Sequence, residues 1–108
     1  SKKNQRWVID QSGTLYLGSD HGLLRSRDNG ATFVELPLII PPEALPILAI
    51  AVDPRDHRRS IVSASNQLYG SSDDGVSWGI LPSPGVKPVT HLVFDWDEPQ
   101  ARYSIVRP

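Results

Sequence analysis

The chain contains two octapeptides of one pattern, Ser26-Arg27-Asp28-Asn29-Gly30-Ala31-Thr32-Phe33 and Ser71-Ser72-Asp73-Asp74-Gly75-Val76-Ser77-Trp78. Both read Ser-x-Asp-x-Gly-x-Thr/Ser-aromatic, they lie 45 residues apart, and Leu-Pro follows each of them. Self-similarity at a fixed period indicates a repeat architecture. Ser and Asp side chains hydrogen-bond nearby backbone in tight turns, and glycine accepts a positive φ. Each octapeptide therefore predicts a hairpin turn whose aromatic residue returns the chain to a strand and buries its ring.

The pattern resembles the Asp-box of the BNR-repeat families, which include sialidases, sortilin-like receptors, xyloglucanases and photosystem assembly factors. The flanks match as well: residues 50–56 and 60–65 follow the family's order of strand, Asp-Pro turn and strand, and a third start lies at 92–95 and 103–106. The resemblance implies an all-β fold of β-propeller blades. It also implies a structural role on the outer rim, away from the catalytic centre, for the residues of the two boxes: Ser26, Asp28, Gly30, Phe33, Ser71, Asp73, Gly75 and Trp78.

Short apolar runs separated by ten Pro and eight Gly predict four-stranded antiparallel meanders. We expect blade 1 at about 7–36, blade 2 at about 47–81 and a partial blade 3 at about 89–107. The expected strands are 7–9, 14–19, 22–26, 32–36, 47–52, 60–65, 67–71, 76–81, 89–94 and 102–106, and residues 42–48 form at most one helical turn. Propellers close with about four to eight blades. The chain is therefore expected to be an incomplete propeller, completed by self-association, by a second chain or by further blades.

Composition excludes several function classes. The 108 residues include no Cys, so disulfides, thiol nucleophiles and Cys-based zinc sites are impossible. A net charge of −1 with scattered Lys and Arg argues against nucleic-acid binding. Residues 36–52 are apolar but contain four Pro and one Glu, which argues against a membrane span. No cofactor motif is present, and the compartment is left open because residue 1 is Ser and a signal peptide could have been removed.

The three histidines, at 21, 57 and 91, lack the i, i+2 or i, i+4 spacing of a metal site. The resemblance implies that the strand carrying His91 lines the central channel. His91 is therefore a candidate ligand contact, and the alternative is a hydrogen bond to a neighbouring blade.

Acidic residues gather after the first strand of each later blade, at Asp53, Asp56, Asp95, Asp97 and Glu98. Paired carboxylates can catalyse glycoside hydrolysis, but these residues stand beside Pro in turn-forming contexts, which favours a structural role. Arg55, Arg58 and Arg59 form a small basic cluster. Arginine pairs carboxylates and phosphates, so Arg55 and Arg58 are candidate partner contacts, and a solvated loop is the alternative.

These observations favour a non-catalytic propeller segment that acts as a binding or assembly scaffold. Its surface would surround His91 and residues 53–59, and its partners would be protein or carbohydrate. The alternative is a fragment of a glycoside hydrolase of sialidase or xyloglucanase type, with its catalytic residues on other blades. In a complex with a second chain, the apolar contacts would come from Trp7, Trp96 and residues 38–40, which otherwise belong to the core between blades.

Overall fold

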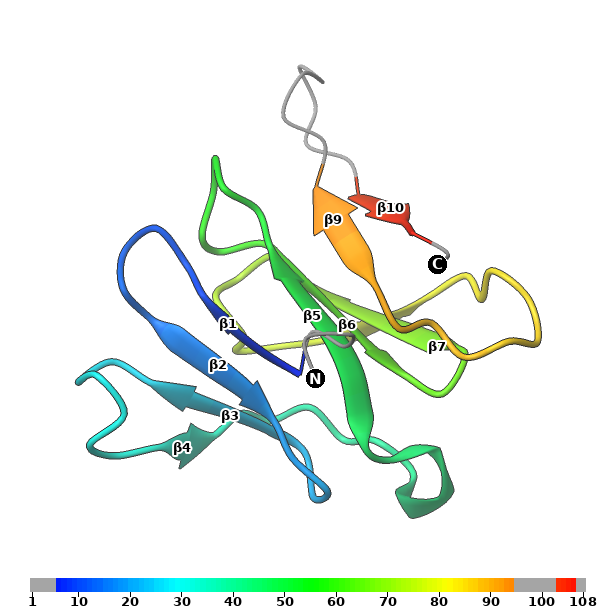
Figure 1. Cartoon of the computed structure of the whole chain (residues 1–108), viewed down its shortest axis with the longest axis horizontal. Helices are drawn as coiled ribbons and strands as arrows, with labels where there is room; N and C mark the ends of the chain where they lie inside the picture. The colour runs from blue at the N-terminus through cyan, green and yellow to red at the C-terminus, as the bar shows by residue number, and fades with distance from the viewer. Residues whose placement is uncertain (1–5, 95–102, 107–108) are drawn as a thin grey trace.

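The computed structural model describes residues 6–94 and 103–106, in which the chain forms three antiparallel sheets (Figure 1). All strands within a sheet follow one another in sequence, as in a meander. The all-β prediction is confirmed. The first sheet contains β1 (Trp7–Ile9), β2 (Leu15–Gly18), β3 (Leu23–Ser26) and β4 (Val34–Glu35); the second contains β5 (Ile47–Val52), β6 (Ser60–Ala64), β7 (Gln67–Ser71) and β8 (Gly79–Leu81); the third contains β9 (Leu92–Phe94) and β10 (Tyr103–Ile105).

The strands after the two octapeptides start later than the sequence predicts. The predicted starts are residues 32 and 76, but β4 begins at Val34 and β8 at Gly79. The cause is local, because the backbone N–H groups of Thr32 and Ser77 donate to aspartate side chains within the turn and not to a neighbouring strand. The turn therefore extends into the range expected for the strand.

The second sheet lies between the other two and is covered on both faces. One face, with Ile50, Val62 and Tyr69, packs against Tyr16 and Leu23 of the first sheet. The opposite face packs against the third sheet in a second cluster, which contains Ala49, Ala51, Ile61, Leu68, Val89, Leu92 and Phe94. The second sheet therefore contributes to both hydrophobic cores of the described structure.

The apolar connection between the first two sheets belongs largely to the core. Leu38 and Ile40 are 6% and 8% exposed, whereas Ile39 between them is 91% exposed. The connection then makes one 3-10 turn, η1 (Pro42–Ala44), before β5 begins. Among residues 6–94 and 103–106, no helix has the length and apolar character that crossing a bilayer requires.

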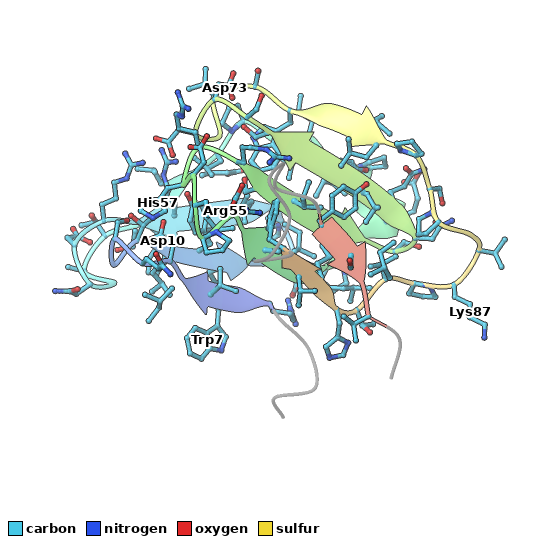
Figure 2. All side chains as sticks on the ribbon, turned by 90° about the horizontal axis from the view of Figure 1, so that it is seen from above. Trp7, Asp10, Arg55, His57, Asp73 and Lys87 are labelled. Atoms are coloured by element: carbon cyan, nitrogen blue, oxygen red, sulfur yellow. The ribbon has the colours of Figure 1, made fainter. Side chains whose placement is uncertain are left out.

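The first sheet leaves one apolar face open. Side chains alternate between the two faces of a strand, so Trp7, which pairs with Leu17, lies on the face opposite Val8 and Tyr16. Leu17 pairs in turn with Leu24, which continues the row across the sheet. Trp7 is 61% exposed, and Figure 2 shows its ring projecting away from the ribbon. We call the row Trp7, Ile9, Leu15, Leu17 and Leu24 the open face.

Candidate functional site

The first octapeptide closes the hairpin between β3 and β4 with its own side chains. The hydroxyl of Ser26 donates to Asp28 Oδ1 at 2.8 Å and accepts the Gly30 N–H, also at 2.8 Å. The carboxylate of Asp28 accepts the backbone N–H of Thr32 at 2.9 Å and also the Thr32 hydroxyl. Asn29 and Gly30 have φ values of 61° and 87°, a region that Asn and Gly tolerate best.

The second octapeptide makes the same contacts between β7 and β8. Ser71 Oγ donates to Asp73 Oδ1 at 2.8 Å and accepts the Gly75 N–H at 2.9 Å. Asp73 accepts the N–H of Ser77 at 2.9 Å together with its hydroxyl. One addition distinguishes it, since the indole Nε1 of Trp78 donates to the Gly75 carbonyl at 3.1 Å. We refer to residues 26–33 as the first turn and to residues 71–78 as the second turn.

Hydrogen bonds to the two turn carboxylates favour their charged form. The side-chain hydroxyl of Thr32, and then its backbone N–H, lower the pKa of Asp28 from 3.8 to about 2. Ser77 acts in the same way on Asp73, whose pKa also falls to about 2. Both carboxylates are therefore charged at neutral pH and fully occupied in holding a turn.

The sequence predicts a buried aromatic ring in both turns, but the two rings differ in their exposure. Trp78 is half-buried and packs against the core between the first and second sheets. Phe33 is 38% exposed, so the prediction that its ring is buried is wrong. The physical reason is that the second turn lies against a neighbouring sheet, where Trp78 packs on the core, whereas Phe33 belongs to neither of the two described cores.

The second turn is docked onto the first sheet. Arg25, on β3, donates to the backbone carbonyl of Asp74 at 2.8 Å, and Arg27 contacts the Asp74 carboxylate at 2.7 Å. The Asp74 N–H donates to the carbonyl of Arg58 at 3.0 Å, which joins the turn to the loop between β5 and β6. A Cβ on Gly75 would meet Leu36 Cδ1 at 3.2 Å, so the turn approaches the first sheet closely.

The first strands of the three sheets, β1, β5 and β9, border an open hollow of about 330 Å³ at their C-terminal ends. Residues 8–11, 50–54 and 92–94 line it, which makes its wall apolar except for Asp10, Gln11 and Asp53. A concave apolar surface with a few polar groups is the usual form of a small-ligand site, and this volume is at the lower end of the range of about 300–1,000 Å³. We call it the inner hollow, and it is the candidate functional site.

The two carboxylates of the inner hollow are held by their own loops. Asp10 Oδ1 accepts the N–H groups of Ser12 and Thr14 at 2.8 and 3.0 Å. Asp53 is only 1% exposed at its side chain and accepts from Arg59 Nη1 at 3.2 Å and from the Arg55 N–H at 2.9 Å. Both carboxylates act as loop anchors at the wall of the inner hollow.

Arg59 links the buried carboxylate to the third sheet. Its guanidinium group lies 5.5 Å from the centroid of the Phe94 ring, a cation–π distance. The same side chain pairs with Asp53, so one residue joins the loop after β5 to β9. This arrangement fixes the position of the wall of the inner hollow that β5 and β9 share.

The residues predicted as ligand contacts do not line the inner hollow. His91 precedes β9, and its Nδ1 lies 2.9 Å from Thr90 Oγ1. Arg58 pairs with Asp56 through two contacts of 3.0 Å and is 72% exposed, and this pair lowers the pKa of Asp56 to about 2. Arg55 is exposed and contributes its backbone N–H to Asp53. Asp95, Asp97 and Glu98, together with Trp96, lie outside the described residues.

Sequence reasoning missed Asp10, Gln11 and Val93 as parts of the wall. One signal was available, because Asp10 follows β1 just as Asp53 follows β5. Recognising this correspondence requires aligning β1 with β5, two short strands that share little sequence. Within the described residues, no group of three or more His, Asp or Glu side chains is placed to hold a metal ion.

Comparisons with known proteins support the fold. No family model matches the chain, and no curated protein matches it. The fold is similar to the crystal structure of an ancestral GH74 enzyme, a β-propeller, with a TM-score of 0.69 over 85% of this chain. The chain is an incomplete β-propeller. It spans 12% of the length of that enzyme at 19% identity, a level at which the likeness shows the fold alone.

Proposed function

We propose that this chain is a non-catalytic segment of an Asp-box β-propeller that acts as a binding or assembly scaffold and is completed by further blades. The observation that carries the proposal is the contrast between two sheets. The second sheet has both faces packed, whereas the first presents Trp7 and Ile9, each 61% exposed, on its open face. Contiguous exposed apolar surface of this kind marks an interaction site.

The register of the sheets supports completion by another sheet. Ser60 pairs with Ser71 as Leu15 pairs with Ser26, so β2 and β3 correspond to β6 and β7. In that correspondence Leu17 and Leu24 take the places of Val62 and Tyr69, which are buried against the preceding sheet. The open face is thus the equivalent of a face that a neighbouring blade covers elsewhere in the same chain.

Light scattering over a wide concentration range tests this proposal, together with binding of a hydrophobic dye. We expect either a discrete oligomer or a monomer that binds the dye on the open face. Trp7→Lys should lower the mass or the dye signal, and Ile39→Lys is the matched control because Ile39 is exposed on a connection. A monomer that binds no dye, or equal effects of both variants, would contradict the proposal.

A second candidate function is a fragment of a glycoside hydrolase. The similarity to a GH74 enzyme and the presence of Asp10 and Asp53 beside the inner hollow favour it. Against it, both carboxylates are engaged in hydrogen bonds within their own loops. A fragment whose catalytic residues lie on other blades is expected to be inactive by itself. Hydrolysis of aryl glycosides by this chain, abolished by Asp10→Asn in a folded variant, would instead favour an enzyme with a catalytic carboxylate on this segment.

A further inference from the structure

The third sheet has an open edge. Among the described residues it contains β9 and β10, whereas the other two sheets contain four strands each. β10 pairs with β9 on one side, and no strand among residues 6–94 and 103–106 lies on its other side. An exposed strand edge is a template for pairing with another polypeptide.

A second hollow lies beside this edge. Its volume is about 220 Å³, and Tyr103 of β10 is part of its wall. The remaining wall comes from the second sheet and its adjoining loops and includes Gly70, Ser71, Ser72 and Leu81. We call it the outer hollow, because it lies beside the later strands β7 and β8 and not beside the first strand of the sheet.

The outer hollow corresponds to the place on the first sheet where the second turn is docked. Gly70 pairs with Ile61 and Gly79 as Arg25 pairs with Tyr16 and Val34. On the first sheet this position contacts the second turn, since Arg25 donates to Asp74 and a Cβ on Gly75 would lie 3.5 Å from Arg25 Nη1. The equivalent position on the second sheet faces the outer hollow.

We propose that the β10 edge and the outer hollow bind a two-stranded hairpin from a partner polypeptide, whose Ser-x-Asp-x-Gly turn carries an uncharged fourth residue. The hairpin would add two strands to the two that the described residues contribute to the third sheet, and would place its turn in the hollow. This inference rests on the proposed function, because it names one way in which the propeller is completed.

The uncharged residue follows from the side chains at the docking position. On the first sheet, Arg25 and Arg27 receive the acidic Asp74 of the second turn. On the second sheet, Gly70 and Ser72 occupy the corresponding positions and bring no charge. A carboxylate docked there would lose water without gaining a new cation, which is unfavourable.

Arg59 also lines the outer hollow, but its charge is already compensated. Its guanidinium group pairs with the buried Asp53 at 3.2 Å and lies over the Phe94 ring. An acidic turn would have to compete with both contacts. A neutral turn such as the first turn, with Asn29 at the fourth position, has no such conflict.

The chain itself provides matched probes for the test. A synthetic peptide of residues 22–37, here called the neutral peptide, contains both strands and the first turn; the acidic peptide is the same segment with Asn29→Asp. Each peptide is titrated into the 15N-labelled 108-residue chain, and amide shifts are followed by NMR. We expect the neutral peptide to perturb Gly70, Ser72 and the β10 residues. The acidic peptide should bind about two- to fivefold more weakly, which is the change in affinity expected for one exposed charge without a partner.

A charge change in the chain should reverse the preference. Ser72→Arg places an arginine where the first sheet has Arg27, and because Ser72 is exposed the variant should fold, as its NMR spectrum will show. This variant should favour the acidic peptide by about two- to fivefold.

Three results would overturn the proposal. They are no response to either peptide, an equal response to a scrambled peptide, and shifts confined to Trp7, Leu17 and Leu24. None of them would affect the mass and dye experiments, which report on the open face of the first sheet. Failure of the hairpin site is therefore distinguishable from failure of the proposed function.

Discussion

The first and second turns have almost the same internal structure but different surroundings. In both, a serine hydroxyl and an aspartate carboxylate make the same hydrogen bonds at closely similar distances. The second turn is docked on the first sheet through Asp74, Gly75 and Trp78, whereas Phe33 of the first turn is 38% exposed. Local sequence therefore determines the shape of each turn, and the neighbouring sheet determines how much the turn contributes to stability.

The largest difference between the turns should come from their aromatic residues. Trp78→Ala removes a ring packed on the core and an indole hydrogen bond, so we expect a loss of about 2–4 kcal/mol in the free energy of unfolding, somewhat below the cost for a fully buried ring. Phe33→Ala should cost less than about 1 kcal/mol because its ring is exposed. Urea unfolding followed by tryptophan fluorescence or circular dichroism measures both values. Equal losses would mean that Phe33 is covered by a partner or by another copy.

The two turn glycines should differ next. Both have positive φ, 83° at Gly75 and 87° at Gly30, so alanine strains either backbone by about 1 kcal/mol. At Gly75 the new Cβ also meets Leu36 Cδ1 at 3.2 Å, whereas at Gly30 the nearest such atom is Leu15 Cδ2 at 3.8 Å. We expect Gly75→Ala to cost about 2–3 kcal/mol and Gly30→Ala about 1 kcal/mol in urea unfolding. A larger loss of stability for Gly30→Ala than for Gly75→Ala would contradict the conclusion that only the second turn is docked closely on a neighbouring sheet.

Within the docking contact, burial should matter more than distance. Arg25 is 13% exposed at its side chain and donates to the Asp74 carbonyl at 2.8 Å, so Arg25→Ala should cost about 1–2 kcal/mol. Arg27 makes the shorter contact to the carboxylate, 2.7 Å, but is 56% exposed, and Arg27→Ala should cost less than about 0.5 kcal/mol. Thermal unfolding at low and high salt measures both. Greater destabilisation by Arg27→Ala at low salt would show that the exposed ion pair dominates the contact.

The sequence predicts the turns well because they are local. The side chains of Ser26 and Asp28 make their hydrogen bonds within the same octapeptide, so the spacing alone specifies these bonds. The docking of the second turn is different, because Arg25 and Asp74 are 49 residues apart and nothing in either segment indicates the pairing. The exposure of Phe33 is equally non-local, since it depends on which sheet lies beside the first turn.

The candidate site was only partly predictable for the same reason. The sequence indicates that residues after the first strand of each sheet gather at one end, and Asp53 does line the inner hollow. Residue type makes His91 and Arg58 candidates, but neither lines the hollow. Residue type alone does not indicate which end of a strand a residue occupies or whether a loop side chain points outward. Asp10 was missed because β1 has only three residues and resembles β5 weakly.

The smallest difference between the turns should appear in their response to acid. The pKa values of Asp28 and Asp73 both fall from 3.8 to about 2, through matching hydrogen bonds from Thr32 and Ser77. A carboxyl whose pKa is lowered by folding stabilises the folded state above its unfolded pKa, so this contribution is present above about pH 4 and is lost as the pH falls to about 2.

Asp28→Asn and Asp73→Asn should therefore each flatten the decline in stability between about pH 4 and 2, and to a similar extent. Unfolding by urea at several pH values measures the slopes. Asp56→Asn serves as the comparison outside the turns. The pKa of Asp56 is also lowered to about 2, but by Arg58 and not by a turn hydroxyl. A much larger change for Asp73 than for Asp28 would mean that docking on the first sheet also strengthens the internal hydrogen bonds of the second turn. In that case the neighbouring sheet would influence the internal structure of the turn as well as its contribution to stability.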